Sequence, residues 1–323
     1  MTDPALDRRE AVIVVNPAAH NSPGHKALVK ADDWLRERGW TAEWLETAGP
    51  GEATGMAARA AERGVPLLFV CGGDGTLNEA VNGLAFSETA IGVIPGGTSN
   101  LWARELGVRE KPVEAVRLAV EGVRRHVDLG RAGSRYFLLM AGYGIDAAAI
   151  HKVSLGVKGR LGAAAYVLSA ARQALSYRSS RVTVSLDGKR CRLNMLLLVA
   201  GNTRLYAGVT QITREAVVDD GLLDVCVYEG RGRWDIIRLG LMTLLGRHGR
   251  SNKVIQRRVK RLALTWEEPL PLQLDGDAIK DSPAEVEVAP GALWVMTPQE
   301  LRSPLFSRRP EPQQARGRHP LLR

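Results

Sequence analysis

The sequence lacks the features of several protein classes. Only 3 of its 323 residues are cysteines, too few for a disulfide framework, which favours a reducing compartment. The first ten residues contain acidic side chains and a proline where an export signal needs basic residues and then an apolar run. The longest uncharged stretch, residues 89–103, is shorter than the roughly 18 to 20 residues of a membrane-spanning helix. We therefore expect a cytoplasmic protein without a membrane span.

Aromatic residues are also scarce, at 5% of the chain, whereas Lys and Arg outnumber Asp and Glu by 44 to 35. The resulting charge of +9 attracts anions such as nucleotides, nucleic acid and anionic lipid head groups. Proteins that bind single-stranded nucleic acid stack bases on aromatic side chains. The most basic strip, residues 247–261, has no Phe, Trp or Tyr. Nucleic acid is therefore the least favoured partner.

The remaining composition, with 45% hydrophobic and 24% charged residues, is that of a globular protein. Its length favours two domains, because single cores rarely grow beyond about 250 to 300 residues. Short β-branched runs at 11–15, 66–70 and 90–95 alternate with helical stretches, which predicts a parallel α/β sheet. After residue 131, strand candidates separated by turns such as Asp187-Gly188 and Pro290-Gly291 predict an antiparallel β-sandwich.

We place the domain boundaries from these patterns. An α/β nucleotide-binding domain is expected at 8–130 and is completed by residues 292–305, and a β-sandwich domain is expected at 131–291. Residues 306–323, rich in arginine and proline, are expected to form a flexible basic tail. Two helices, over 157–177 and 234–246, are predicted within the β-sandwich domain.

The most informative segment is FVCGGDGTLNEAVNG, residues 69–83, in which a strand leads into a glycine turn and then a helix. Glycines let the backbone approach a ligand closely, and the free N–H groups of a helix start can bind phosphate. We interpret the turn as a cradle for nucleotide phosphates, with an ordinary glycine turn as the alternative. IPGGTSN (94–100), Asn16-Pro17 and Thr47 follow other strands, and ligands bind at such strand ends in open α/β sheets.

A second segment, LDGD at 274–277, carries two acids. In an extended chain, residues i and i+2 point to the same side, so Asp275 and Asp277 are expected to lie together. Their mutual repulsion would raise the pKa of one carboxyl and suit it to accept a hydroxyl proton. A plain Asp-Gly turn is the alternative.

Five segments in this order resemble the diacylglycerol kinase catalytic-domain family, in particular its bacterial soluble lipid kinases, which are related to sphingosine kinases. The segments are GGDGTLNEAVNG (72–83), PGGTSN (95–100), FLLMAGYGIDA (137–147), DDGLLDV (219–225) and LDGD (274–277). The resemblance implies an ATP-binding α/β domain and a β-sandwich domain with acceptor and metal elements. It also implies Mg²⁺-dependent transfer of phosphate from ATP to a lipid hydroxyl, most simply that of diacylglycerol. NAD kinases share the GGDG element, so an NAD-kinase-like enzyme is the alternative.

The resemblance also implies roles for single residues. The base would be Asp277, with Asp275 as the alternative, and Asp128 and Asp146 would belong to a carboxylate network near the metals. A structural Mg²⁺ would be bound by the Asp220 carboxylate and the main-chain oxygens of Val217 and Leu222, and a hairpin turn at Asp220-Gly221 is the alternative. Contacts to ATP are implied for Asn16, Pro17, Thr47, Gly72, Gly73, Asp74, Gly75, Thr76, Leu77, Asn78, Gly97 and Thr98.

The sequence departs from this family at three places. Leu101 stands where many relatives have an aspartate, and the turn after Asn16-Pro17 reads Ala18-Ala19-His20 instead of a glycine turn. Within residues 201–216, Thr203, Ala207 and Arg214 stand where glycines and a proline are common. A catalytically silent relative that binds lipid or membrane is therefore a second alternative.

The apolar segment 234–245 precedes a strongly basic one. An apolar helix beside basic residues is typical of reversible docking on an anionic membrane surface, and a core helix followed by a solvated hairpin is the alternative. We therefore expect a lipid substrate and peripheral membrane association, and the sequence leaves a homodimer open. The basic residues are Arg247, Arg250, Lys253, Arg257, Arg258, Lys260 and Arg261.

Overall fold

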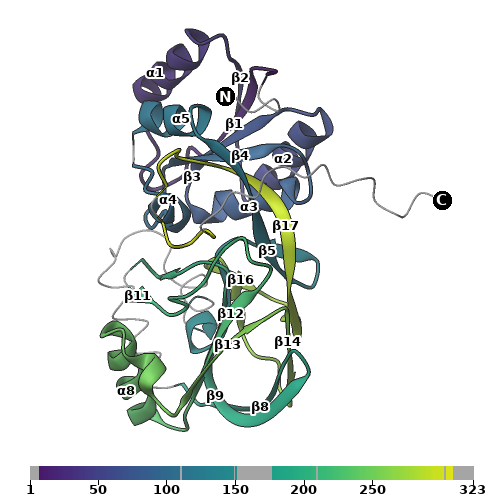
Figure 1. Cartoon of the computed structure of the whole chain (residues 1–323), viewed down its shortest axis with the longest axis vertical. Coiled ribbons are helices and arrows are strands. Elements are labelled where there is room, and N and C mark those ends of the chain that lie inside the picture. The colour runs from purple at the N-terminus through teal and green to yellow at the C-terminus, as the bar shows by residue number, and fades with distance from the viewer. Residues whose placement is uncertain are drawn as a thin grey trace, which may run out of the picture.

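The computed structural model describes residues 7–109, 111–148, 150, 177–208, 210–301 and 303–307, so most of the helix expected at 157–177 and nearly all of the expected tail lie outside the described residues. Two regions are stacked along the long axis of the molecule (Figure 1). The upper region contains the predicted parallel sheet, and its strands lie in the order β2-β1-β3-β4. Its strands are β1 (Glu10–Val15), β2 (Thr41–Glu46), β3 (Leu67–Gly72) and β4 (Ala90–Pro95).

Helices cover both faces of the parallel sheet. The pair α1 (His25–Arg36) and α5 (Pro112–Val120) packs on one face, and the pair α2 (Glu52–Glu62) and α3 (Asp74–Leu84) packs on the other. Every residue of β3 and β4 is buried, which explains their uninterrupted apolar runs. The short helix α4 (Leu101–Glu105) follows β4.

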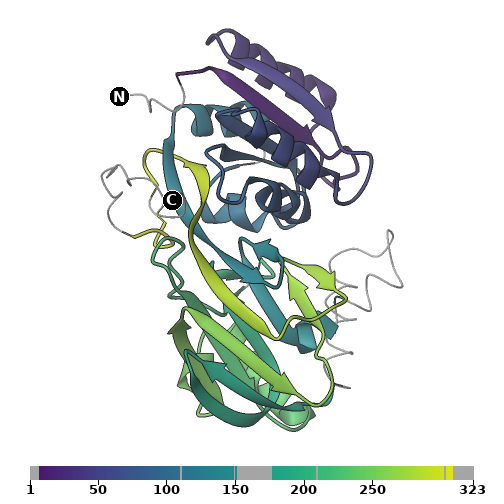
Figure 2. The same cartoon turned by 90° about the vertical axis from the view of Figure 1, so that its right-hand side faces the viewer.

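The lower region is a sandwich of two antiparallel layers that share the long strand β9 (Figure 2). The second half of β9 pairs with β7 and β12, whereas its first half pairs with β8. Apolar side chains from both layers form one core between them. One layer contains β13 (Val254–Val259), β12 (Leu223–Glu229), β9 (Lys189–Gly201), β7 (Met140–Gly144), β15 (Leu272–Leu274) and β16 (Asp277–Ile279). The other contains the start of β9, β8 (Ser180–Leu186), β14 (Arg261–Trp266), β17 (Glu285–Thr297), β5 (Val123–Ala132) and β6 (Arg135–Phe137).

Some strand predictions need correction. The turn predicted at Pro290-Gly291 is wrong, because β17 continues through these residues as a bulge between Ala289 and Leu293. Residues 258–266 belong to two strands, β13 and β14, which join at Lys260, whose N–H donates to the Asp187 carboxylate. The turn predicted at Asp187-Gly188 joins β8 to β9, and both residues have positive φ.

The strands β5 and β17 connect the two regions. They pair from Val286 opposite Ala132 to Thr297 opposite Val123, and the sequence analysis did not predict β5. At its end β17 also pairs in parallel with β4 through Trp294 and Val295. The chain therefore enters the sandwich along β5 and returns to the parallel sheet along β17 (Figures 1 and 2).

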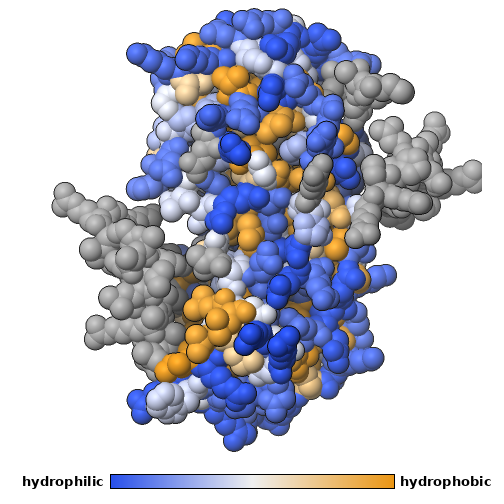
Figure 3. All heavy atoms as spheres, turned by 60° about the vertical axis from the view of Figure 1, so that its left-hand side comes forward, coloured by the Kyte–Doolittle hydropathy of each residue, from blue (hydrophilic) through white to orange (hydrophobic). Residues whose placement is uncertain are grey.

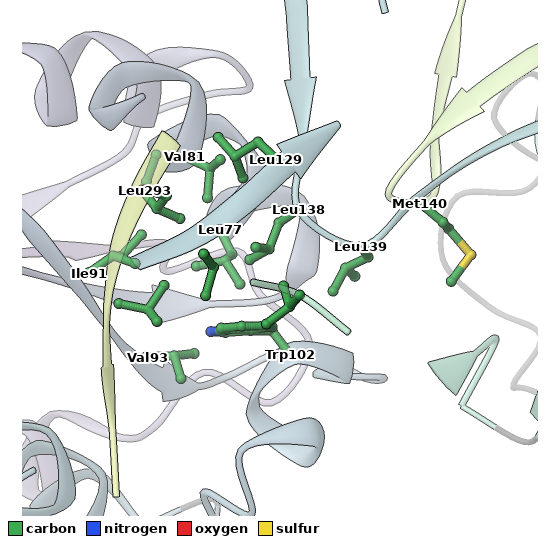
Figure 4. Packing of buried hydrophobic residues seen from close by; sticks show 14 of the residues in the cluster. Leu77, Val81, Ile91, Val93, Trp102, Leu129, Leu138, Leu139, Met140 and Leu293 are labelled. Atoms are coloured by element: carbon green, nitrogen blue, oxygen red, sulfur yellow. The ribbon is translucent and has the colours of Figure 1, made fainter. Parts of the chain in front are cut away.

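Apolar packing also crosses between the regions. Leu138, Leu139 and Met140, from the segment that leads into β7, belong to the same buried cluster as Leu77 of α3 and Trp102 of α4 (Figure 4). One buried cluster therefore spans the two regions, in addition to the core between the sandwich layers. Among the described residues, no helix has both the length and the apolar character needed to span a membrane.

The sandwich region also contains a short hairpin and the helix α8. The strands β10 (Leu205–Tyr206) and β11 (Thr210–Gln211) form a small hairpin next to α4. The helix α8 (Arg233–Leu244), which agrees with the helix predicted at 234–246, lies at the far end of the molecule from the parallel sheet and is followed by a 3₁₀ turn at His248–Arg250 (Figure 1).

The last glycine of the NEAVNG segment, Gly83, lies where α3 crosses α2. A Cβ on Gly83 would overlap the Thr54 carbonyl oxygen and approach the Ala57 Cβ to 2.8 Å. We predict that Gly83→Ala lowers the free energy of unfolding by about 1 to 3 kcal/mol, the usual cost of overpacking. The matched control is Gly240→Ala in α8, where a Cβ has open space and the substitution should stabilise the protein by about 0.5 to 1 kcal/mol. Urea unfolding measures the free energy of unfolding of both variants. Equal changes in the two would contradict the close crossing of α2 and α3.

Candidate functional site

The two glycine turns contact each other at the carboxyl ends of β3 and β4. The Gly96 N–H donates to the Gly72 carbonyl over 2.9 Å. A Cβ on Gly97 would lie 2.5 Å from the Gly73 Cα, and one on Gly73 would lie 3.2 Å from the Gly97 Cα. None of these four glycines has positive φ. Glycine is needed here for the close backbone approach, and the first turn leads directly into α3, whose first-turn N–H groups lie at the sheet edge.

The second glycine turn is braced by Asn100. Its side-chain oxygen accepts from the Gly97 N–H over 2.9 Å, and its amide donates to the Gly97 carbonyl over 2.8 Å. Asp74, the first residue of α3, accepts from the Trp102 N–H at 3.4 Å. Burial raises the pKa of Asp74. The backbone N–H groups of Leu101, Trp102 and Asn100 and the charge of Arg104 oppose the rise. Asp74 therefore fastens the first turn to the start of α4.

The loop after β1 joins the same site despite its unusual sequence. The Asn16 amide donates to the Thr76 hydroxyl over 2.9 Å. Asn21, which the sequence analysis did not single out, donates its backbone N–H to the Gly96 carbonyl and its amide to the Gly97 carbonyl, at 2.9 and 3.1 Å. The segment Ala18-Ala19-His20 is thus held on the glycine turns from the Asn21 side. Only an unremarkable asparagine marks this contact in the sequence.

The other residues implied to contact ATP occupy different positions. Pro17 and Thr98 are exposed at the tips of their loops, whereas Thr47 is buried with its hydroxyl 3.5 Å from the Val15 carbonyl. Leu77 belongs to the buried core, and the buried Asn78 faces the sandwich. The structure therefore brings Asn16, Thr76 and the glycine turns together, and it places Leu77 and Asn78 behind them.

Asp275 is buried and fully occupied by hydrogen bonds. Its carboxylate accepts from the N–H groups of Leu138, Leu139 and Met140 at 2.8 to 2.9 Å and from the Asn78 amide at 2.6 Å. Burial raises the pKa of Asp275 to about 6, and the four donors oppose a larger rise. This carboxylate therefore ties the β15–β16 hairpin to α3 and to the segment before β7.

Asp277 has a different environment. The expectation that both acids lie on one side of an extended chain is wrong, because Asp275 and Gly276 have φ of 50° and 92° and form a tight turn between β15 and β16. The exposed side chain of Asp277 reaches the first glycine turn, where both carboxylate oxygens lie 3.8 Å from the position of a Cβ on Gly75.

The pKa of Asp277 is set by its surroundings and not by Asp275. Partial desolvation raises the pKa, Arg135 lowers it and Glu79 raises it. The Glu79 carboxylate accepts from the N–H groups of Gly51 and Ala53 at the start of α2, over 2.7 and 3.2 Å. The sequence analysis missed both residues, because Arg135 belongs to no motif and Glu79, although it lies within GGDGTLNEAVNG, gives no sign in the sequence that it approaches Asp277.

The carboxylates of Asp128 and Asp146 accept hydrogen bonds within the sandwich. Asp128 accepts from the N–H groups of Gly221 and Gly291, over 2.6 and 2.7 Å, and so joins the Asp220-Gly221 turn to the bulge of β17. Asp146 accepts from the Ala147 N–H, the Tyr206 hydroxyl and the Gln273 amide. Burial raises the pKa of Asp146 to about 6.

The predicted magnesium site lies beside Arg258. Arg258 is opposite Asp224 across the β12–β13 pair, and its guanidinium forms ion pairs with Asp220 and Asp224. The other Asp220 oxygen accepts from the Leu222 N–H over 3.0 Å. These oxygen ligands are of the kind that Mg²⁺ prefers, and the guanidinium shows that the position holds positive charge. An ion at Asp220, Val217 and Leu222 would have to take the place of Arg258.

No group of three or more His, Cys, Asp or Glu side chains in the described part of the chain is arranged to hold a metal ion. A single carboxylate with carbonyl oxygens does not form such a group. The magnesium site therefore stays a prediction.

Comparison with known proteins gives consistent matches along the chain. Residues 10–132 match the family described as diacylglycerol kinase catalytic domain, and residues 140–297 match that described as YegS C-terminal NAD kinase beta sandwich-like domain. A protein from Bacillus subtilis named diacylglycerol kinase is 31% identical over 272 residues, which are 83% of this chain and 90% of that protein. One of the same name from Staphylococcus carnosus is 28% identical over 92% of this chain and 97% of its own.

A solved structure shows the same fold. The crystal structure of a candidate diacylglycerol kinase from Bacillus anthracis superposes with a TM-score of 0.75 at 27% identity. The superposition covers 90% of this chain and 97% of that chain. The parallel α/β region and the antiparallel β region are therefore an arrangement that this chain shares with known structures.

The contact between the glycine turns gives a test of the phosphate cradle. Gly97→Ala places a Cβ 2.5 Å from the backbone of Gly73, whereas in Gly96→Ala the nearest atoms lie at 3.4 Å. Backbone atoms cannot move aside as a side chain can, so we predict at least about a tenfold weaker affinity for ATP in Gly97→Ala, equivalent to about 1.4 kcal/mol. The affinity of Gly96→Ala for ATP should stay close to that of the unaltered protein. Isothermal titration calorimetry measures both, and an unchanged affinity in Gly97→Ala would contradict the cradle.

Proposed function

This chain belongs to the diacylglycerol kinase catalytic-domain family, and from that premise we propose that it is an ATP- and Mg²⁺-dependent lipid kinase. Its acceptor is the hydroxyl group of a lipid alcohol, most simply diacylglycerol. The observation that carries the proposal is the position of Asp277, whose carboxylate lies against Gly75 in the first glycine turn. A base supplied by the sandwich and a phosphate cradle supplied by the α/β region thus meet at one point.

The glycine turns suit the binding of the ATP phosphates. The free N–H groups at the start of α3 favour anions, and the absence of side chains on Gly73 and Gly97 lets the two turns lie close together at the carboxyl ends of β3 and β4. The hydrogen bond from Asn16 to Thr76 fixes the first turn of α3. Phosphoryl transfer depends on such positioning and on neutralisation of charge more than on covalent chemistry.

Asp277 is the group best placed to take the proton from the acceptor. A general base works well when its pKa lies nearer to the working pH than that of an ordinary carboxyl, and desolvation shifts the pKa of Asp277 in that direction. Asp275 cannot easily do this, because both of its oxygens already accept hydrogen bonds. Asp275 instead holds the turn that carries Asp277.

Magnesium bound with ATP would neutralise phosphate charge in the transition state. Within this chain, Asp220 and the carbonyl oxygens of Val217 and Leu222 would hold a second, structural ion in exchange for the Arg258 guanidinium. Removal of Mg²⁺ by a chelator should therefore abolish turnover. A change in melting temperature on chelation would report the structural ion separately.

The proposal is tested by incubating the purified protein with ATP, Mg²⁺ and a panel of lipid alcohols, with NAD in a parallel reaction. We expect a phosphorylated lipid, detected by mass spectrometry, and no NADP. Formation of NADP would support the NAD-kinase-like alternative. Absence of both products would support a silent relative, in keeping with Leu101 and the unusual segment 201–216.

Substitutions of the two acids should separate the base from the structural carboxylate. Asp277→Asn is predicted to lower kcat by roughly 10² to 10⁴, the usual contribution of a general base, and to leave the melting temperature and ATP affinity nearly unchanged. Asp275→Asn should lower the melting temperature as well, because an amide N–H₂ would face N–H donors in a buried site. A strong loss of kcat with an unchanged melting temperature in Asp275→Asn would reverse the assignment.

The charge of Arg135 gives a prediction about pH dependence. Arg135 stabilises the ionised form of Asp277 and so lowers its pKa. Arg135→Gln should therefore move the acidic limb of the kcat/KM profile to higher pH, because the base is protonated over a wider range. The control is Arg131→Gln, since Arg131 pairs with Glu287. An acidic limb that stays in place in Arg135→Gln would argue against Asp277 as the titrating base.

A further inference from the structure

The helix α8 presents an apolar face to solvent. Seven large hydrophobic side chains are exposed in the part of the chain that the structure describes, and five of them lie on α8 or directly after it. The exposed fractions are 75% for Trp234, 44% for Ile237, 57% for Leu241, 68% for Leu244 and 61% for Leu245. Trp234, Ile237, Leu241 and Leu244 are spaced by three or four residues and therefore lie on one side of the helix. Together with Leu245, which follows the helix, they form a continuous apolar patch (Figure 3).

The opposite side of α8 attaches the helix to the sandwich. Leu239 and Thr243 are buried, and the Thr243 hydroxyl lies 2.8 Å from the Tyr228 hydroxyl. Asp235 pairs with Lys253 over 2.5 Å and accepts from the Arg231 N–H. The helix is therefore fixed by its mixed polar and apolar side, and its most apolar side remains uncovered by any described residue. The alternative interpretation of this segment as a core helix does not apply to this face, because its apolar side chains are exposed.

Positive charge surrounds the apolar face. Arg233 and Arg238 on α8 are exposed, as are Arg247 and Arg250 just after it. None of these four arginines forms an ion pair with a carboxylate in the described ranges, and Asp235, the one acid on α8, is neutralised by Lys253.

The basic strip expected from the sequence contributes less charge than its composition suggests. Arg258 pairs with Asp220 and Asp224, and Arg261 pairs with Glu285. Their positive charges are therefore largely compensated. Within the described residues, Arg257 and Lys260 of the strip form no ion pair with a carboxylate, so the uncompensated charge lies on α8, in the segment directly after it and at these two residues.

We propose that the exposed face of α8 is a docking surface for an anionic phospholipid bilayer. The inference rests on the proposed function, because a lipid acceptor has to be reached at the bilayer surface. Apolar side chains that enter the boundary between head groups and acyl chains, beside arginines that meet anionic head groups, are the two elements of reversible interfacial binding. The combination of a bare apolar face with uncompensated arginines favours an anionic bilayer over a neutral apolar partner.

The docking surface is connected to the candidate active site through the β10–β11 hairpin. The Thr210 hydroxyl donates to the Thr243 carbonyl of α8 over 3.0 Å. At the other end, Arg104 of α4 donates to the Gly208 carbonyl, and Glu105 of α4 accepts from the N–H groups of Arg204 and Leu205. α4 follows the second glycine turn, and both helices lie on the same side of the molecule (Figure 1). A bilayer bound at α8 would therefore lie on the same side of the molecule as α4, which follows the second glycine turn.

The test uses the whole protein and sedimentation with vesicles of phosphatidylcholine, alone or mixed equally with phosphatidylglycerol. We expect binding to the mixed vesicles that weakens as salt rises, because the Debye length falls from about 30 Å at 0.01 M to about 3 Å at 1 M. The triple variant Trp234→Ser, Leu241→Ser, Leu244→Ser should bind at least about tenfold more weakly, since three large apolar side chains no longer leave water. The matched control is Val29→Ser on α1, where the side chain is 42% exposed.

A second pair of variants tests the charge without altering the apolar face. The double variant Arg233→Gln, Arg238→Gln should lose most of the preference for the anionic vesicles. Arg261→Gln should keep it, because Glu285 already compensates Arg261. Equal effects of the two substitutions would show that net charge, and not α8, attracts the protein to the vesicles.

Activity separates this inference from the proposed function. The triple variant should phosphorylate a short-chain, water-soluble diacylglycerol as well as the unaltered protein does, and vesicle-embedded diacylglycerol much more slowly. Vesicle binding that is unchanged in the triple variant would overturn the docking surface and leave the kinase proposal standing. Binding that depends on α8 in a protein that phosphorylates no lipid would uphold the surface and overturn the kinase. Self-association through α8 without vesicle binding would also overturn the docking surface.

Discussion

The candidate site depends on the buried carboxylate of Asp275. A buried charge is costly unless hydrogen bonds satisfy it. Asp275 receives four, from Asn78 of α3 and from the consecutive N–H groups of Leu138, Leu139 and Met140, where the chain enters β7. The same contacts hold the β15–β16 turn against α3, and Asp277 lies at the end of that turn. The position of the proposed base over Gly75 is therefore a consequence of how a neighbouring charge is buried.

The sequence predicts the α/β region well because its signals are local. A buried strand that ends in glycines and continues as a helix defines the first glycine turn without long-range information. The two acids of LDGD show the limit of such reasoning. The Asp-Gly pair is a turn signal as well as a pair of acids, and only the fold shows that Asn78, nearly 200 residues earlier in the chain, determines which acid is buried.

Other features could not be predicted because their partners are distant in sequence. The strand β5 has four charged residues among its ten and no clear alternation, and it is stabilised by β17, more than 150 residues later. In the sequence, Arg258 belongs to a basic strip, and only the β12–β13 register shows that it lies opposite Asp224. Asn21 has no motif of its own, yet it attaches the loop after β1 to the second glycine turn.

The pairing of β5 with β17 also limits how the two regions can move. The chain crosses between them twice, once along each strand, and the two crossings are hydrogen-bonded to each other over nearly their whole length. Hinged enzymes absorb rotation in a few unpaired residues between domains, and the unpaired residues of β17 in this connection are those of its bulge, where the Gly291 N–H is held by the Asp128 carboxylate. Opening of the site is thus confined to bending and twisting of one ribbon, so that access of a bulky acceptor has to come from rearrangement of loops more than from separation of the two halves.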